Sequence, residues 1–351
     1  MSTLAEPAPS ETAGRSPAGA PITVDLLLVG AGPVGLYGAY YAGFRGLSVA
    51  LIDSLQEAGG QITAMYPEKM IFDVAGFPAI KGRDLVAGLV EQAAPFAPTY
   101  LLGQQAVSLH RGADDGVLVV GSDGGTTVRC KSVIISGGIG TFTPRPLPAG
   151  SEYENRGLHY FVPALGVHAG KDVVIIGGGD SAFDWALNLQ PIARSVTLVH
   201  RRTAFRAHAH TVSLVGATDV EIITEAQVTA VRGADQVEEV DILVGPAKGE
   251  KVVRTLPAQT LIAALGFVAN IGPLTSWGFT IEHNRHIPVD TAMRTDVEGV
   301  FAAGDIADYP GKVRLISVGF GEVATAVNNA AVLIDPAAHL FPGHSSDAPA
   351  V

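Results

Sequence analysis

Cysteine is almost absent from this chain of 351 residues, which contains only Cys130. A single cysteine excludes an intramolecular disulfide, a redox-active CxxC pair and any metal site built on several cysteines. Cys130 opens the apolar run CKSVIISGG, so we expect an inert thiol in the core. The lack of disulfides and of secretion features favours a cytoplasmic protein.

Positive charge is also scarce, since 23 Lys and Arg face 34 Asp and Glu for a formal net charge of −11. This balance argues against a nucleic-acid partner or an anionic membrane surface. Long hydrophobic runs are interrupted: residues 26–44 carry no charge, but glycines and Pro33 favour a strand, a turn and a helix over a membrane span. Residues 1–21 lack the basic start and apolar centre of a signal peptide, and we expect a disordered leader.

Apolar and glycine residues are plentiful, with 47% hydrophobic residues and 42 glycines, in a chain long enough for two domains. From Ile22 onward, short β-branched or leucine-rich runs alternate with helical segments, which is typical of a parallel-sheet α/β protein. We expect strands at 24–29, 48–52, 132–136, 172–176, 195–199, 259–263 and 299–302.

The architecture repeats along the chain. Residues 104–129 and 228–256 each carry short alternating runs separated by turn residues, which indicate β-meanders. Each half therefore consists of a βαβ unit, a meander and a final strand that ends in glycine. The sequence predicts an α/β fold of two Rossmann-like domains, with residues 144–271 inserted into a discontinuous domain of 22–143 plus 272–351.

The first glycine-rich loop has the GxGxxG pattern, with Gly30, Gly32 and Gly35 directly after a strand and Pro33 at the start of the helix. The first glycine permits a tight turn, the second a close backbone approach to a pyrophosphate, and the third close packing of helix on strand. Asp53 closes the next strand, where a carboxylate accepts ribose hydroxyls. The loop therefore indicates FAD or NAD, with a purely structural turn as the alternative.

The second glycine-rich loop has Gly177 and Gly179, followed by Asp180 and Ser181. The position equivalent to Asp53 is His200. A basic cluster follows it and consists of Arg201, Arg202 and Arg206. Guanidinium groups bind a 2′-phosphate where a carboxylate would repel it, so this site indicates NADP(H). A solvated charge run is the alternative.

A third motif, GVFAAGDI at 299–306, is a strand that runs into Gly304 and Asp305. We expect Asp305 to meet the ribityl or pyrophosphate part of the first cofactor. A helix beginning near Gly321 would direct its positive end at the flavin O2 region. This motif favours FAD over NAD in the first site.

Taken together, these segments resemble the thioredoxin-reductase-like ferredoxin–NADP⁺ reductases, a group of two-dinucleotide-binding flavoproteins, over nearly all of 22–346. The resemblance is carried by GAGPVGLYGAYYAGFRG, GGQITAMYPEKMIFDVAGFP, GLHYFV, GGGDSAFDWAL, HRRTAFRAHAH, FAAGDIADYPGKVRLISVGFGEVATAVNNA and FPGHSS. Thioredoxin reductases carry a CxxC just before the second glycine loop. The corresponding stretch here, GLHYFVPALG, has no cysteine.

The resemblance implies FAD and NADP(H) as cofactors, with hydride passing from NADPH to flavin N5 and single electrons then leaving for ferredoxin or flavodoxin. It places Tyr66 and His344 on opposite faces of the flavin, His344 from the partner subunit of a homodimer. It assigns further FAD contacts to Asp53, Gln61, Val107, Phe142, Asp305, Ser345 and Ser346. No acid–base residue is implied.

Two other functions stay open. One is a flavin monooxygenase or NADPH oxidase that passes electrons to O₂, and the other is a non-catalytic redox sensor. Because ferredoxins are acidic, docking would need a local basic surface, for which Lys312, Arg314, Arg285 and Arg294 are candidates. His208 and His210 have no third ligand nearby in the sequence, so no metal site is expected.

Overall fold

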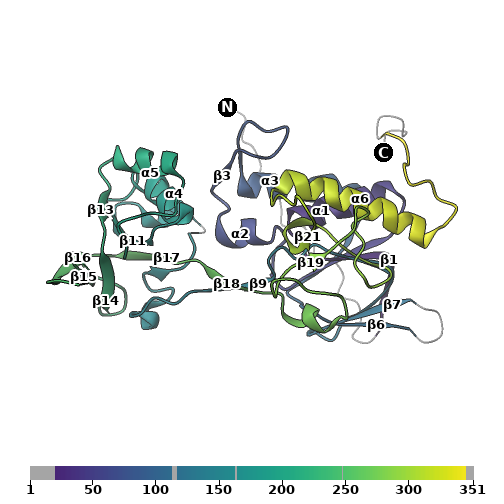
Figure 1. The fold of residues 1–351 in the computed structure, drawn as a ribbon, viewed down its shortest axis with the longest axis horizontal. Helices are drawn as coiled ribbons and strands as arrows, with labels where there is room; N and C mark the ends of the chain where they lie inside the picture. Colours follow the sequence, from purple (N-terminus) through teal and green to yellow (C-terminus); the bar gives the residue numbers. More distant parts are fainter. Residues whose placement is uncertain (1–19, 113–116, 163, 247, 345–351) are drawn as a thin grey trace, which may run out of the picture.

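The computed structural model describes residues 20–112, 117–162, 164–246 and 248–344 (Figure 1). Most of the expected leader, residues 1–19, lies outside the described residues. The chain forms two α/β domains that lie apart in Figure 1 and are joined through the strands β9 (Thr141–Pro144) and β18 (Phe267–Asn270). The two-domain α/β prediction is confirmed.

The larger domain is built on a seven-stranded sheet with the order β5-β2-β1-β8-β7-β6 and with β20 also paired to β8. β1, β2, β5, β8 and β20 run parallel, whereas β6 and β7 are antiparallel to their neighbours. The strands are β1 (Ile22–Val29), β2 (Val49–Asp53), β5 (Thr99–Leu102), β6 (Ala106–Arg111), β7 (Leu118–Ser122), β8 (Thr127–Ile135) and β20 (Val300–Ala302). The strands predicted in this half are therefore present, and β5 was missed.

One strand combines two features that the sequence pattern separated. The first meander and the final strand before the glycines were expected as distinct elements, but β8 is both. Its first half pairs with β7, from Thr127 to Cys130, and its second half pairs with β20, from Val133 to Ile135. Because β1 borders β8 along its whole length, the meander is continuous with the parallel sheet.

Alternation along β1 explains why the sheet is buried on both faces. Leu26 and Leu28 point into one core together with helices, while Leu27 and Val29 belong to a second core on the other side. The helices on the first face are α1 (Pro33–Phe44), α3 (Gly82–Ala93) and α6 (Ile316–Ile334). The buried sheet holds Cys130 at 1% exposure, and burial raises the pKa of its thiol to about 12, as expected for an inert core thiol.

Helix α6 begins at Ile316, five residues before the Gly321 start expected from the sequence, so that expectation was wrong. Gly319 lies inside the helix. Its lack of a side chain permits the helix to pack closely on Val34, since a Cβ on Gly319 would lie 2.5 Å from Val34 Cγ2. Within the described part of the chain, α6 is also the one helix long and apolar enough to span a membrane. Its Val323 and Val327 are fully buried in the core, which accounts for that apolar character.

The smaller domain has a parallel five-stranded sheet, β10-β17-β11-β12-β13, and an antiparallel three-stranded meander, β14-β15-β16. Ile175 on β11 packs toward helices α4 and α5, whereas its neighbour Ile176 packs toward the meander. The elements are β10 (Leu158–His159), β11 (Asp172–Gly177), α4 (Asp180–Leu189), β12 (Ser195–Val199), α5 (Ala209–Gly216), β13 (Glu221–Ile223), β14 (Ala226–Arg232), β15 (Glu239–Val244), β16 (Val252–Pro257) and β17 (Thr260–Ala264). The second meander is thus confirmed as a sheet of its own.

The two chain crossings pair with each other as β9 (Thr141–Pro144) and β18 (Phe267–Asn270), antiparallel. They lie at the two ends of residues 144–271, the segment predicted as the inserted domain. The remaining short elements are α2 (Gln61–Met65), β3 (Met70–Ile71), β4 (Ile80–Lys81), β19 (Ile287–Pro288), β21 (Ala307–Asp308) and the 3₁₀ turns Ala94–Phe96, Ser151–Tyr153, Leu165–His168, Gly272–Ser276 and Gly304–Ile306.

Candidate functional site

A cavity with a volume of about 1550 Å³ lies where the two domains face each other. This exceeds the range of about 300–1,000 Å³ that is usual for small-molecule sites. The larger domain contributes the ends of β1 and β2, helix α2, the turn after β20 and the start of α6, and the smaller domain contributes α4 and α5. The cavity therefore reaches the first expected nucleotide site and, in the smaller domain, the start of α4 at Asp180. The other residues expected at the second site do not line it: Gly177, Gly179, Ser181, His200, Arg201, Arg202 and Arg206.

The first glycine-rich loop has the geometry that the sequence predicted. Gly30 has φ +115°, and a Cβ there would lie 2.5 Å from the Ser136 carbonyl oxygen. A Cβ on Gly35 would lie 1.9 Å from the Gly30 oxygen, so this glycine permits the close helix–strand contact. Gly32 is the N-cap of α1 and Pro33 its first residue, which leaves the positive end of the helix at the cavity.

Asp53 lies at the end of β2 and lines the cavity. Its Oδ2 accepts the Ala31 N–H at 2.7 Å and its Oδ1 accepts the Leu55 N–H at 2.9 Å. Burial raises the pKa of the carboxyl, and these two N–H groups oppose the rise. Because each carboxylate oxygen accepts more than one hydrogen bond, the group retains acceptor capacity for two hydroxyls.

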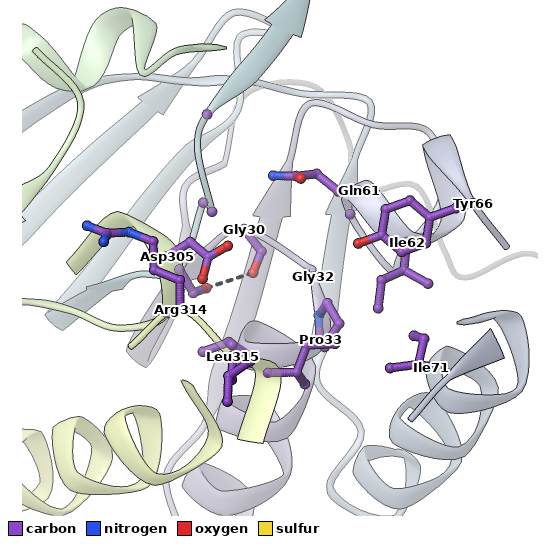
Figure 2. Close-up of a pocket in the computed structure, with 18 of the residues that line it drawn as sticks. Gly30, Gly32, Pro33, Gln61, Ile62, Tyr66, Ile71, Asp305, Arg314 and Leu315 are labelled. Carbon is purple, nitrogen blue, oxygen red and sulfur yellow. Dashed lines mark hydrogen bonds between the residues drawn. The ribbon is translucent and has the colours of Figure 1, made fainter. Parts of the chain in front are cut away.

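Gln61 and Tyr66 flank the other side of the loop (Figure 2). Gln61 begins α2, and Tyr66 follows its last turn. The Tyr66 ring packs against the cores of both domains, and burial raises the pKa of its hydroxyl, with the nearby charges of Asp305 and Asp73 adding to the effect. A neutral aromatic ring therefore stands at the junction of the two domains.

Asp305 stands opposite these residues, in the turn after β20 (Figure 2). Burial raises the pKa of its carboxyl, whereas Lys312 and Arg314 lower it. Arg314, Leu315 and Ile316 also line the cavity, so the positive end of α6 is directed there despite its earlier start. The sequence thus located this element correctly and misjudged its first residue.

The second glycine-rich loop is closed by the segment that follows β12. The Arg206 N–H donates to the Gly178 oxygen at 2.7 Å, and a Cβ on Gly178 would lie 2.3 Å from the His200 ring. Position 177 has no room for a side chain either, because a Cβ on Gly177 would lie 2.6 Å from the Ala264 oxygen. The basic segment is therefore held against the glycine-rich loop.

Helix α4 starts from this loop, with Gly179 as N-cap and Asp180 and Ser181 as its first residues. Asp180 lines the interdomain cavity, and its Oδ1 accepts the His208 N–H at 2.8 Å.

Arg201, Arg202 and Arg206 form an exposed basic cluster. Within the described residues, none of the three makes an ion pair with a carboxylate. His200 adds no charge at neutral pH, because burial lowers its pKa and the three neighbouring guanidinium groups lower it further. An anion at this loop would therefore be recognised by arginine.

Other expected contacts fall outside the cavity or outside the described residues. Val107 does not line it, although the adjacent Gln105 and Ala106 do. Phe142 lies in β9 next to Thr141, which lines the cavity. His344 is 5.2 Å from Phe341, ring centre to ring centre, and does not line the cavity of its own chain. Ser345 and Ser346 lie outside the described residues.

Two residues of the site were missed in the sequence. Lys69, after α2, forms an ion pair with Asp184 of α4 at 2.5 Å, and both line the cavity. Asp184 is one helical turn beyond Asp180, so the two share a face of α4, and this spacing was the available signal. The ion pair joins the two domains across the cavity.

The docking role expected for Lys312 was wrong. Its side chain is 2% exposed and pairs with Glu322 in the interior, so it offers no charge to a partner. Arg314 is exposed and pairs with Asp308 at 2.9 Å, and Arg285 and Arg294 are also exposed. Charged residues in a loop suggest solvation, and only tertiary packing reveals that one of them is buried.

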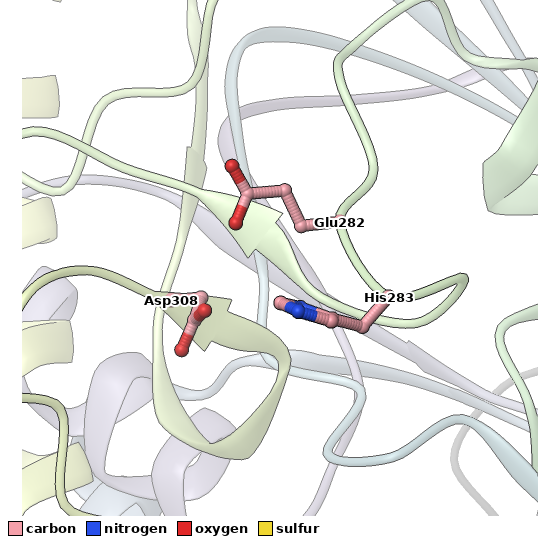
Figure 3. Close-up of side chains that lie close together, drawn as sticks. All are labelled: Glu282, His283 and Asp308. Carbon is pink, nitrogen blue, oxygen red and sulfur yellow. The ribbon is translucent and has the colours of Figure 1, made fainter.

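Glu282, His283 and Asp308 are close enough to share a metal ion (Figure 3). Glu282 and His283 are exposed, and Asp308 already accepts a hydrogen bond from Arg314. A metal ion here would compete with Arg314 for the Asp308 carboxylate, and the expectation of no metal stays a prediction.

The sequence matches the pyridine nucleotide-disulphide oxidoreductase family over residues 24–330. A protein named ferredoxin–NADP reductase from Nocardioides sp. (strain ATCC BAA-499 / JS614) is 63% identical over 93% of this chain and 98% of its own length. One of the same name from Frankia alni is 64% identical over 92% and 98%.

Among solved structures, the thioredoxin reductase of T. acidophilum has a TM-score of 0.74 at 26% identity, covering 90% of this chain and 99% of the other. Family membership implies FAD and NADP(H) as cofactors, and the glycine-rich loops, Asp53 and the unpaired arginines fit them. The chain belongs to the pyridine nucleotide-disulphide oxidoreductase family, in the group of thioredoxin-reductase-like ferredoxin–NADP reductases.

Proposed function

We propose that this chain transfers electrons between NADPH and ferredoxin, so that one NADPH reduces two one-electron acceptors and yields NADP⁺ and a proton. Ferredoxin, or flavodoxin in its place, is the electron partner. FAD, when bound, supplies the conversion between two-electron and one-electron steps. The observation that carries the proposal is a single cavity that reaches from the first glycine-rich loop to helix α4, in a chain whose one cysteine is buried elsewhere.

The larger domain would hold FAD through the residues that surround the first loop. Gly30, Gly32, Pro33 and Gly35 present the start of α1 to the pyrophosphate, and Asp53 accepts ribose hydroxyls. Asp305 would meet the ribityl chain, Gln61 the ring system and Tyr66 one ring face. Val107 and Phe142 would contribute through the backbone positions next to the cavity lining. Their placement around one cavity supports the assignment for most of them.

The smaller domain would hold NADP(H) through the second loop. Gly177, Gly179, Asp180 and Ser181 form the turn and the start of α4, where pyrophosphate binds. Arg201 and Arg202, with Arg206 beside them, would bind the 2′-phosphate, and His200 would pack beneath the loop as a neutral ring. These three arginines are exposed, and none of them pairs with a carboxylate among the described residues, which supports this role.

The test is an anaerobic titration. NADPH should bleach the flavin absorbance of the holoenzyme, and oxidised ferredoxin or flavodoxin mixed with it should restore the absorbance in one-electron steps. Fast NADPH consumption in air with stoichiometric peroxide, and no acceleration by ferredoxin, would instead identify an oxidase that uses O₂. A bound flavin that NADPH reduces only on a time scale of many minutes would indicate a redox sensor.

A homodimer completes the proposed site. His344, with Ser345 and Ser346 following, would cover the second flavin face of the partner subunit, since His344 does not reach the cavity of its own chain. Leu340 and Phe341, 54% and 63% exposed, are apolar surface that a partner would cover.

A heterodimer tests this crossing. One chain carries His344→Ala and the other Asp53→Ala, which weakens its FAD site. The one intact flavin then has a normal absorbance spectrum only if the tail crosses between subunits.

The domain boundaries and the location are part of the proposal. We assign residues 22–143 plus 272–351 to FAD and 144–271 to NADP(H), supported by the paired crossings β9 and β18. Residues 144–271 expressed alone should fold and bind NADPH without flavin. The proposed compartment is the cytoplasm, where a one-thiol chain is compatible with reducing conditions, and cell fractionation tests it.

A further inference from the structure

A buried charged cluster lies directly behind the turn that carries Asp305. Lys312 and Glu322 form an ion pair whose side chains are only 2% and 4% exposed. Lys312 comes from the loop before α6 and Glu322 from α6 itself. Tyr309 joins them, donating its hydroxyl to Glu322 Oε1 at 2.6 Å. Burial and the Glu322 carboxylate raise the pKa of that hydroxyl to about 12, so it remains a donor.

Lys312 and Glu322 both form hydrogen bonds with the backbone of Gly304, the residue before Asp305. Glu322 Oε2 accepts the Gly304 N–H at 2.8 Å, and Lys312 Nζ donates to the Gly304 carbonyl at 2.9 Å. Gly304 itself has φ +79°, a conformation that favours glycine. The turn is therefore held from two sides by opposite charges on two different segments.

Stability alone does not explain this arrangement. Desolvating two charges usually costs as much as their attraction returns, and apolar replacements of such pairs are often neutral or stabilising. Removing one partner alone leaves a buried charge without compensation. At this place the uncompensated charge would stand behind Gly304 and Asp305, both of which line the cavity.

We propose that Lys312 and Glu322 are positioning residues for the flavin: they hold the Asp305 turn and keep the charge behind the flavin pocket balanced, which sets the reduction potential of the bound FAD. This inference rests on the proposed function, since it requires FAD in this cavity. Reduction adds negative charge to the flavin. A lone positive charge nearby favours the reduced form, and a lone negative charge disfavours it.

The experiment compares Lys312→Met, Glu322→Gln and the double variant as holoenzymes. The flavin midpoint potential is measured by anaerobic titration against reference dyes, without NADPH or ferredoxin. Glu322→Gln should raise the potential, Lys312→Met should lower it, and the double variant should return close to the wild type. A unit charge about 10 Å away at an effective dielectric constant of about 20 changes the oxidised-to-reduced ratio on the order of tenfold. For a two-electron couple, tenfold corresponds to about 30 mV.

Arg232→Met is the matched control, because it breaks an ion pair with Asp241 in the remote meander of the smaller domain. It should leave the potential unchanged. Shifts of the same sign in both single variants, or no shift in either, would overturn the inference and leave the pair with a structural role only. A wild-type protein that retains no FAD would instead refute the proposed function, so the two failures are distinguishable.

Discussion

Replacing Arg201 and Arg202 together by alanine should convert this chain from NADPH preference toward indifference between NADPH and NADH. The two guanidinium groups are exposed, and no carboxylate of the described structure pairs with them. The backbone of the same segment is bonded to the second glycine-rich loop through Arg206 and Gly178. A 2′-phosphate beside that loop would therefore meet both side chains, whereas NADH offers them nothing to bind.

The magnitude follows from the value of charge-assisted hydrogen bonds, about 1.5–3 kcal/mol each. Because both arginine side chains are exposed, water and salt compete for the arginines and the phosphate, and each hydrogen bond contributes an energy near the lower end of this range. Two such bonds amount to about 3 kcal/mol, which corresponds to a loss of about 100-fold in kcat/KM for NADPH. The value for NADH should change less than about threefold.

Steady-state reduction of a dye by NADPH and by NADH, at low and at high salt, measures this preference. The matched control is Arg254→Ala, which removes an exposed arginine of the meander strand β16 that pairs with Glu221 at 3.0 Å. In the wild type, added salt should erode the NADPH advantage, since the contacts are solvent-exposed. Equal losses for both nucleotides in the double variant would refute the 2′-phosphate assignment.

Three further outcomes are expected. Gly30→Ala should abolish FAD retention and destabilise the chain by more than about 1 kcal/mol, because φ is +115° and the Ser136 oxygen is 2.5 Å from a Cβ; a holoprotein with normal flavin content would contradict this. Lys69→Met should raise the population of separated domains up to about fivefold, since a partly exposed pair contributes about 0.2–1 kcal/mol; unchanged small-angle scattering would contradict it. His168 is buried, and burial first, then His159 and Lys171, lower its pKa to about 4. The unfolded chain therefore binds the proton more readily than the folded chain. The free energy of unfolding has its full value above pH 6.5 and falls by up to about 3 kcal/mol as the pH drops toward 4. Denaturant titrations of wild type and His168→Asn should differ in this pH window, and parallel pH profiles would exclude His168 as the cause.

The central strands and both glycine-rich loops were predictable because their signals are local. A run of apolar residues that ends in glycine forms a buried parallel strand followed by a turn, as in β1 and β11. The replacement of the carboxylate by His200 was also predictable, because Asp53 and His200 lie at the same spacing after the first glycine of their loops. These features need no knowledge of how distant segments pack.

The structural features that could not be predicted from the sequence depend on contacts between segments that are distant in the chain. The strand β13, three residues long, is stabilised by its place beside β12 more than by its own sequence. The start of α6 was misplaced because Gly319 resembles a helix breaker, whereas it permits the contact with Val34. Lys312 resembles a solvated loop charge because its partner Glu322 lies on the next helix. In each case, a neighbour far away or on another element decided the outcome.

The proposed electron transfer has to proceed without a dithiol, because the chain has a single cysteine. In the segment that aligns with the CxxC of thioredoxin reductases, Phe161 stacks on Phe267 of β18, with ring centres 5.2 Å apart and planes 6° apart. A stacked aromatic pair beside a domain connection stabilises packing but has no thiol to accept electrons. With Cys130 buried in the sheet, the proposed function requires an acceptor that approaches the flavin through the cavity itself. Phe72, which lines that cavity and is 72% exposed, marks its accessible rim. The same fold therefore keeps both glycine-rich loops, and under the proposed function an acceptor has to approach at this exposed rim, since the one cysteine of the chain is buried elsewhere.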